Sequence, residues 1–156
     1  MDFAAIDFET VMCRDGRSGE PWQLGIAFVS GGEVVETREF FFDVEGAPER
    51  ATGEGSLGTI QSSFETWAPL LEGRRLAAHN ASCERTILTR AAPFTKWGPW
   101  TDTMRLAKAR YPGLPSYALG DLCEAFGCVP QMAGRAWHDG LFDAVACANL
   151  ALLLSI

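Results

Sequence analysis

Short apolar runs separated by turn residues dominate the beginning of the chain. Residues 3–6 form a run that suits a buried strand, and residues 22–29 form a longer one. Gly31-Gly32 is typical of a two-residue hairpin turn, and the run over residues 33–42 then returns as a third strand. The pattern therefore predicts that the chain opens with three strands, each antiparallel to the one before.

Helical periodicity takes over after a Gly- and Glu-rich segment, residues 44–60, which we expect to form a long loop. Pro69 is expected to bend or shorten the first helix. The predicted helices cover residues 62–71, 82–90, 102–110, 117–126 and 140–154, with short strands at 75–78 and 100–101. This alternation predicts a single α/β domain over residues 1–156, in which helices flank a five-stranded mixed sheet.

The charge and cysteine content narrow the expected partners and location. The formal net charge is −7 at pH 7, whereas proteins that grip long duplexes are usually basic, so strong non-specific binding to nucleic acid is not expected. The five cysteines include no C-x-x-C pair, which argues against a zinc ribbon or a disulfide framework and favours a reducing cytoplasm. The N-terminus has no basic region of the kind that begins a signal peptide, and the apolar run over 150–156 is too short to span a bilayer, so we expect no membrane association.

Two acids interrupt the first apolar run. Asp7 and Glu9 are two residues apart, so in a strand their side chains point to the same face. Two carboxylates side by side at the end of a buried strand are costly unless a positive charge lies between them. A divalent cation that prefers oxygen ligands, Mg²⁺ or Mn²⁺, would supply that charge. The alternative is that both acids begin a solvated loop.

Both histidines of the chain lie close to an acid where two predicted elements meet. His79 precedes Glu84 at the start of one helix, and His138 precedes Asp143 at the start of the last. Asp143 stands among small apolar residues and therefore needs a partner, which a metal shared with Asp7 would supply. The alternatives are a surface histidine at a helix N-terminus and an acid on a solvated helix face.

Three segments carry a resemblance to a known family. They are residues 6–10 (Ile-Asp-Phe-Glu-Thr), residues 78–85 (Ala-His-Asn-Ala-Ser-Cys-Glu-Arg) and residues 138–144 (His-Asp-Gly-Leu-Phe-Asp-Ala). In this order they resemble the three exonuclease motifs of the DEDDh family, and in particular the epsilon-subunit-like proofreading exonucleases of bacterial DNA polymerase III. The resemblance implies a ribonuclease-H-like fold. It also implies 3′→5′ removal of nucleoside monophosphates from single-stranded or frayed ends, of DNA in preference to RNA.

The same resemblance implies a role for each matching residue. Four acids would hold two Mg²⁺ or Mn²⁺ ions, and a histidine would act as general base. These five catalytic positions are Asp7, Glu9, Glu84, Asp143 and His138. Four further positions would contact the substrate: Thr10, Phe8, His79 and Asn80. Two tryptophans could stack on bases or pack in the core, and five basic residues could contact phosphates or lie on solvated helix faces. They are Trp100 and Trp137, and Arg85, Arg105, Lys108, Arg110 and Arg135.

One position departs from the family pattern. The acid of the second motif is Asp in the family and Glu84 here, and its neighbour Cys83 replaces the usual aromatic residue. Glu84 keeps the charge but reaches one methylene further, so it ligates the second metal with a shifted backbone, ligates through water, or weakens the site; we expect ligation. The competing interpretation is a catalytically weakened exonuclease fold that binds nucleic acid or a protein partner, such as a polymerase, without cutting.

Overall fold

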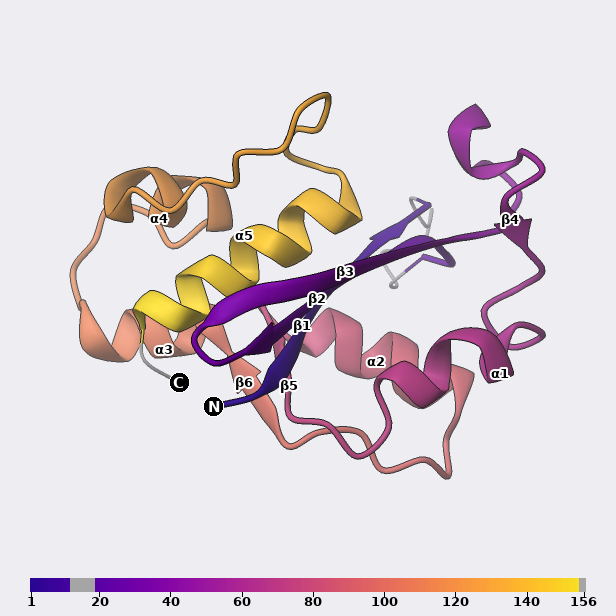
Figure 1. Ribbon diagram of the computed structural model, residues 1–156, viewed down its shortest axis with the longest axis horizontal. Coiled ribbons are helices and arrows are strands. Elements are labelled where there is room, and N and C mark those ends of the chain that lie inside the picture. The colour runs from indigo at the N-terminus through magenta and orange to yellow at the C-terminus, as the bar shows by residue number, and fades with distance from the viewer. Residues whose placement is uncertain (12–18, 155–156) are drawn as a thin grey trace.

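A twisted mixed sheet forms the centre of the molecule (Figure 1). The computed structural model describes residues 1–11 and 19–154. The strands are β1 (Phe3–Thr10), β2 (Pro21–Ser30), β3 (Glu33–Phe42), β4 (Ser56–Leu57), β5 (Leu76–Ala78) and β6 (Trp100–Asp102), and their spatial order is β4-β3-β2-β1-β5-β6. The first three strands pair antiparallel, as predicted, and β5 pairs parallel to β1, so β1 lies in the middle of the sheet.

The expected number of strands is wrong by one, because β4 lies inside the segment that was expected to be a loop. Only Ser56 and Leu57 belong to it, and they pair parallel with Phe41 and Phe42 of β3. Two residues cannot show the alternation that identifies a strand in sequence. The strand exists because the end of β3 offers free backbone groups, which is a tertiary cause.

The helices follow the predicted order with small changes at their ends. They are α1 (Phe64–Trp67), α2 (Ser82–Ala91), α3 (Thr103–Arg110), α4 (Leu119–Phe126) and α5 (Gly140–Leu153), with 3-10 turns at Glu49–Ala51 and Ala68–Leu70. Helix α1 ends at Trp67, and Pro69 lies in the 3-10 turn that follows it. This confirms that Pro69 shortens the first helix. None of the described helices has the length and apolarity needed to cross a membrane.

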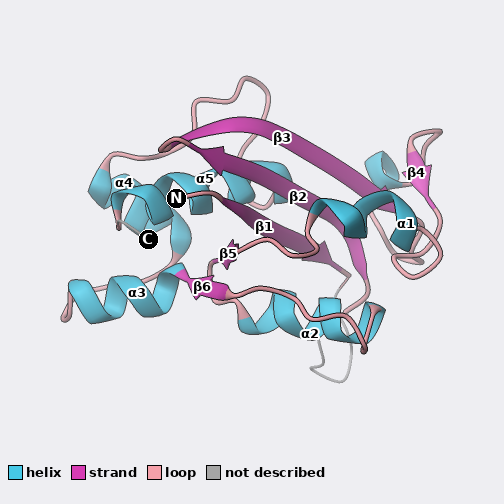
Figure 2. Ribbon diagram, turned by 60° about the horizontal axis from the view of Figure 1, so that its bottom comes forward, coloured by secondary structure: helices cyan, strands magenta, loops and turns pink. Residues whose placement is uncertain are grey.

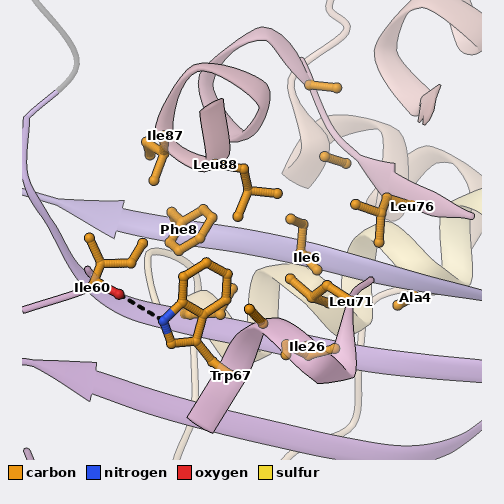
Figure 3. Close-up of a cluster of buried hydrophobic side chains, with 14 of the residues drawn as sticks. Ala4, Ile6, Phe8, Ile26, Ile60, Trp67, Leu71, Leu76, Ile87 and Leu88 are labelled. Carbon is orange, nitrogen blue, oxygen red and sulfur yellow. Dashed lines mark hydrogen bonds between the residues drawn. The ribbon is translucent and has the colours of Figure 1, made fainter. Parts of the chain in front are cut away.

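The helices cover the two faces of the sheet. Helix α5 lies along one face, whereas α1 and α2 cover the other, as the two ribbon views show (Figures 1 and 2). On β1, Ala4, Ile6 and Phe8 pack with the α1–α2 side around the fully buried Trp67 (Figure 3). Because side chains alternate along a strand, Asp7 points to the opposite face, toward α5.

Helix α5 approaches the sheet unusually closely. A Cβ atom on Gly25 of β2 would lie only 2.1 Å from the carbonyl oxygen of Gly140, so only glycine fits at that position. Behind this contact, Ala144, Ala148 and Ala151 are fully buried and keep the rest of the helix near the strands. Gly25 pairs with Asp7 in the β1–β2 ladder, so the first turn of α5 lies directly against the strand pair that carries the acids.

A third cluster of apolar side chains joins α3 and α4 to the outer side of α5, with Leu122 and Leu150 at its centre. Cys123, Cys128 and Cys147 have free thiols, and those of Cys123 and Cys147 are buried. Cys13 lies outside the described residues.

Candidate metal centre

Three carboxylates from two elements meet at the end of β1. One oxygen from each of Asp7, Glu9 and Asp143 can be chosen so that all three lie within 4.8 Å of one another. Asp7 and Glu9 share a face of β1, and Asp143 lies in the first turn of α5, which the Gly25–Gly140 contact presses against that face. Oxygen atoms at this spacing, from carboxylates that are all half-buried, form a ligand set suited to Mg²⁺ or Mn²⁺.

The electrostatics of the group favour a cation. Burial raises the pKa of Asp7 well above its ordinary value, and the negative charges of four neighbouring acids, Glu84, Asp143, Glu9 and Asp139, raise it further. Burial likewise raises the pKa of Asp143 to about 6 and raises that of Glu9, on which the charge of Asp143 also acts. A divalent cation among these oxygens would offset the repulsion that makes the ionised forms costly.

Glu84 lies alongside this group but outside the set of three. It sits in the first turn of α2, is 4% exposed, and exerts the strongest charge effect on the pKa of Asp7. Burial raises its own pKa to about 7, although the backbone amides of Glu84 and Phe8 oppose the rise. The longer side chain has therefore not carried the charge away from the site.

Two buried oxygens test whether these residues fit a metal. Glu84 Oε2 and Asp143 Oδ1 are buried and have no hydrogen-bond partner among the described residues. A buried acceptor without a donor is costly, and both atoms belong to acids whose charge raises the pKa of Asp7. The unmet ligand capacity and the clustered charge both fit a divalent cation.

His138 lies next to the acids on the loop that precedes α5. Its backbone has a φ of +66°, and its amide donates a hydrogen bond of 3.2 Å to Oδ2 of Asp143. The left-handed conformation, uncommon for a residue with a Cβ atom, ends the loop just before Asp139 caps α5. The residue is exposed, so its imidazole can reach solvent and a substrate beside Asp143.

A polar network that the sequence did not predict supports this loop. Arg135 donates to both carboxylate oxygens of Glu39 on β3, at 2.7 and 2.8 Å, and to Oδ1 of Asp139 at 2.9 Å. Asp139 in turn caps α5 by accepting from the amides of Leu141 and Phe142. The network thus fixes the loop that carries His138 against the third strand.

Gln23 and Arg50 complete the network from the sheet and from the long connection after β3. Gln23 is fully buried; its Nε2 donates to Glu39 and its Oε1 accepts from the amide of Gly140 at 3.0 Å. Arg50 donates to Asp139 at 3.1 Å and stacks over the ring of Trp22. Among these residues only Gln23 carries a sequence signal, a polar residue inside an apolar strand.

The predicted substrate-contact residues have different environments. Both ring nitrogens of His79 bond within the protein, to Thr103 Oγ1 and to the carbonyl of Tyr117, each at 2.9 Å. The ring therefore ties β5 to α3 and to the segment before α4, and no nitrogen is left for a substrate. Asn80 is exposed with a φ of +60° and lies at the C-terminal end of β5.

Phe8 is 6% exposed and packs in the core, on the opposite face of β1 from Asp7 (Figure 3). Thr10 is half-buried at the bulge that ends β1, and contact with substrate stays a prediction for it and for Asn80. Trp137 packs edge-on against Phe142, with ring centroids 4.9 Å apart, which matches the packing alternative.

The comparisons with solved structures identify the fold. The mixed sheet, whose central strand carries paired acids with an acid of the last helix beside them, has the fold of solved exonucleases, one of which is described as a DEDDh family member. No protein-family model matches the chain, and no curated protein matches it in sequence. The structural likeness therefore establishes the fold, and the likeness to an epsilon subunit stays a prediction.

Three solved structures illustrate the match. Exonuclease X in complex with 5′ overhanging duplex DNA is 22% identical, with 97% of this chain and 90% of that chain covered and a TM-score of 0.74. The nuclease domain of 3′hExo, a DEDDh family member bound to rAMP, is 15% identical, with coverage of 97% and 90% and a TM-score of 0.70. Exonuclease I from Methylocaldum szegediense is 20% identical with a TM-score of 0.69, but this chain spans only 40% of its length.

Proposed function

We propose that this protein is a metal-dependent 3′→5′ exonuclease that releases nucleoside monophosphates from single-stranded or frayed ends. The observation that carries the proposal is the group of Asp7, Glu9 and Asp143, with Glu84 buried beside it. Four acids brought together from three distant parts of the chain, two of them with buried oxygens that have no partner within residues 1–11 and 19–154, are costly to fold unless they serve a site. The fold shared with known exonucleases supports the same conclusion.

In this proposal the acids divide between two ions. Asp7, Glu9 and Asp143 would hold one Mg²⁺ or Mn²⁺ ion, and Asp7 with Glu84 would hold a second, directly or through water. Bound ions of this kind lower the pKa of an attacking water and neutralise charge that develops on a phosphate.

The protein's own groups supply the proton transfer. The imidazole of His138 accepts a proton from the water that attacks the phosphorus of the terminal nucleotide. The bond from phosphorus to the 3′ oxygen of the preceding nucleotide breaks, and that oxygen takes a proton from solvent to become a 3′-hydroxyl. A nucleoside 5′-monophosphate is released and the strand is one nucleotide shorter. The backbone amide of His138 donates to the carboxylate of Asp143, and Arg135 donates to Asp139, the next residue of the loop. These bonds position the base before substrate arrives.

We propose DNA as the preferred substrate because exonuclease X, whose TM-score is higher than that of 3′hExo, is in complex with DNA. RNA is the competing substrate because 3′hExo is bound to rAMP. A polymerase or another replication or repair protein as partner, and a cytoplasmic location, stay predictions.

The test uses 5′-labelled DNA and RNA oligonucleotides, single-stranded and recessed, with Mg²⁺ or Mn²⁺. The wild type should shorten them stepwise from the 3′ end, and EDTA should stop the reaction. Asp7→Asn should lower the rate by about a hundredfold or more, as expected when charge that stabilises the transition state is lost. Asp43→Asn, at an exposed position after β3, is the matched control and should retain activity.

The competing function is a binding module with this fold, and the position of Glu84 gives it a specific basis. If the longer side chain prevents a second ion from binding, the wild type would bind the oligonucleotides without cutting them in either metal. Glu84→Asp would then restore cutting, whereas in an active enzyme it would change the rate without creating activity.

A further inference from the structure

Helices α2 and α3 lie next to β6 at the edge of the sheet (Figure 2). Residues of both helices and of β6 line a basic hollow there. Its volume is about 630 Å³, within the range of pockets that hold small ligands. Arg85 of α2 and Arg105 and Lys108 of α3 line it, together with Asn80 and the half-buried ring of Trp100. We call this feature the α2–α3 hollow.

The cations of the hollow outnumber its acids by three to one. Asp102 is the one acid among the lining residues, and its carboxylate is held by the amides of Asn80, Ala81, Met104 and Arg105 and forms no salt bridge with any of these three described cations. Arg85 and Arg105 are exposed, and Lys108 lies 5.5 Å from the ring of Tyr117. On a chain with a net charge of −7, three cations gathered in one hollow mark a local site for an anionic ligand.

The hollow lies on one particular side of the metal centre. Burial is the largest influence on the pKa of each acid; among the charged neighbours, His138 acts on Glu9 and Asp143, whereas Asp102 and Glu9 act on Glu84. Asp102 lines the hollow and accepts from the amides of Asn80 and Ala81, directly before the helix that carries Glu84 in its first turn, so the hollow lies on the side of Glu84.

The geometry of the displacement reaction places the retained strand on the side of Glu84, and this step rests on the proposed function. In an in-line displacement the water enters opposite the leaving oxygen. If His138 takes the proton of the water, the water enters on the side of Asp143, and the leaving oxygen departs on the side of Glu84. That oxygen belongs to the strand that remains after cleavage, so this strand extends from the centre toward α2.

We propose that the α2–α3 hollow binds the phosphate backbone of the retained strand, just upstream of the cleaved bond. Arg85, Arg105 and Lys108 contact successive phosphates, and Trp100 offers a ring face to a base. This site gives the enzyme its grip on a strand although the surface as a whole is acidic. It recognises a single strand of any sequence, because backbone phosphates carry no sequence information.

The experiment compares 5′-labelled single-stranded DNA of two to twelve nucleotides in Mn²⁺. For the wild type, kcat/KM should increase with length until the hollow is filled, mainly through KM. The triple variant Arg85→Gln/Arg105→Gln/Lys108→Gln should lose most of this increase. Its log KM should also depend less on log salt, by about 2 in slope, since each phosphate contact on a single strand contributes about 0.7.

A matched triple variant removes the same charge elsewhere. Arg38→Gln/Arg74→Gln/Lys96→Gln neutralises three exposed cations that do not line the hollow, and it should keep the length dependence and salt slope of the wild type. Thermal unfolding of both triple variants, read by circular dichroism, identifies any loss that comes from misfolding. If the hollow triple variant fails to fold, single substitutions at its three positions take its place. Each is expected to lose part of the length dependence and part of the salt slope.

Two results would overturn the inference while leaving the exonuclease proposal intact. One is a wild type whose kcat/KM is the same for dinucleotides and dodecamers; the other is a hollow variant that keeps the full increase with length. If the wild type cuts nothing, the exonuclease proposal fails. Fluorescence anisotropy of a labelled dodecamer then tests whether the α2–α3 hollow binds a strand. Tighter binding by the wild type than by the hollow variant supports the site, and equal binding refutes it.

Discussion

Replacing Glu84 with glutamine should make the metal-free protein more stable. The carboxylate is 4% exposed, Oε2 has no partner among the described residues, and Asp7 lies beside it. Burial raises the pKa of this group to about 7, so at alkaline pH the folded protein carries a charge that the unfolded chain holds at lower cost. Glu84→Gln removes that charge and keeps the shape of the side chain.

The magnitude follows from the pKa. A rise from 4.5 to about 7 corresponds to roughly 3 kcal/mol of stability lost when the group is fully ionised. The folded state binds this proton more tightly than the unfolded state, so the free energy of unfolding falls as the pH rises from about 4.5 to about 7 and then levels off. Because the glutamine amide also needs a partner, we expect a gain of about 1–3 kcal/mol at pH 8, or about 2–10 °C in Tm.

The assay is thermal unfolding in EDTA at pH 5 and at pH 8, repeated with Mn²⁺. The advantage of Glu84→Gln over the wild type should be small at pH 5 and large at pH 8, and the wild type should gain more from Mn²⁺ than the variant. Glu72→Gln, at an exposed position, is the control and should follow the wild type. The reasoning is refuted if the difference between Glu84→Gln and the wild type does not grow between pH 5 and pH 8.

Three other substitutions test how the site is supported. Gly25→Ala should cost about 3 kcal/mol or more in urea unfolding, because the new Cβ atom would lie 2.1 Å from the carbonyl oxygen of Gly140; wild-type stability would contradict the close contact. Arg135→Gln should lower kcat more than it changes KM, because it frees the loop from Glu39, and Arg135→Lys should recover part of the loss; an unchanged kcat would remove the network from the mechanism. Asp102→Ala should lower Tm by the equivalent of about 1–2 kcal/mol, because it leaves the amides at the start of α3 without their cap, whereas Asp102→Asn should lose less.

Local patterns were sufficient for most of the secondary structure and for the pairing of the first two acids. Alternation and a Gly-Gly turn identify β1, β2 and β3, because these features depend on residues close in sequence. The spacing of Asp7 and Glu9 places both on one face of β1 for the same reason. The two residues of β4 were missed because their strand conformation depends on a neighbour and on no pattern of their own.

Tertiary structure decided how the distant acids meet and what holds them. Asp143 lies beside Asp7 because two glycines let α5 come within backbone contact of β2, a fit that neither segment shows alone. The network around Arg135 joins residues nearly a hundred positions apart, and a single sequence records no such pairing. Periodicity along a chain reports which face of an element is buried, but the partner of a buried charge is chosen by the packing of the whole fold.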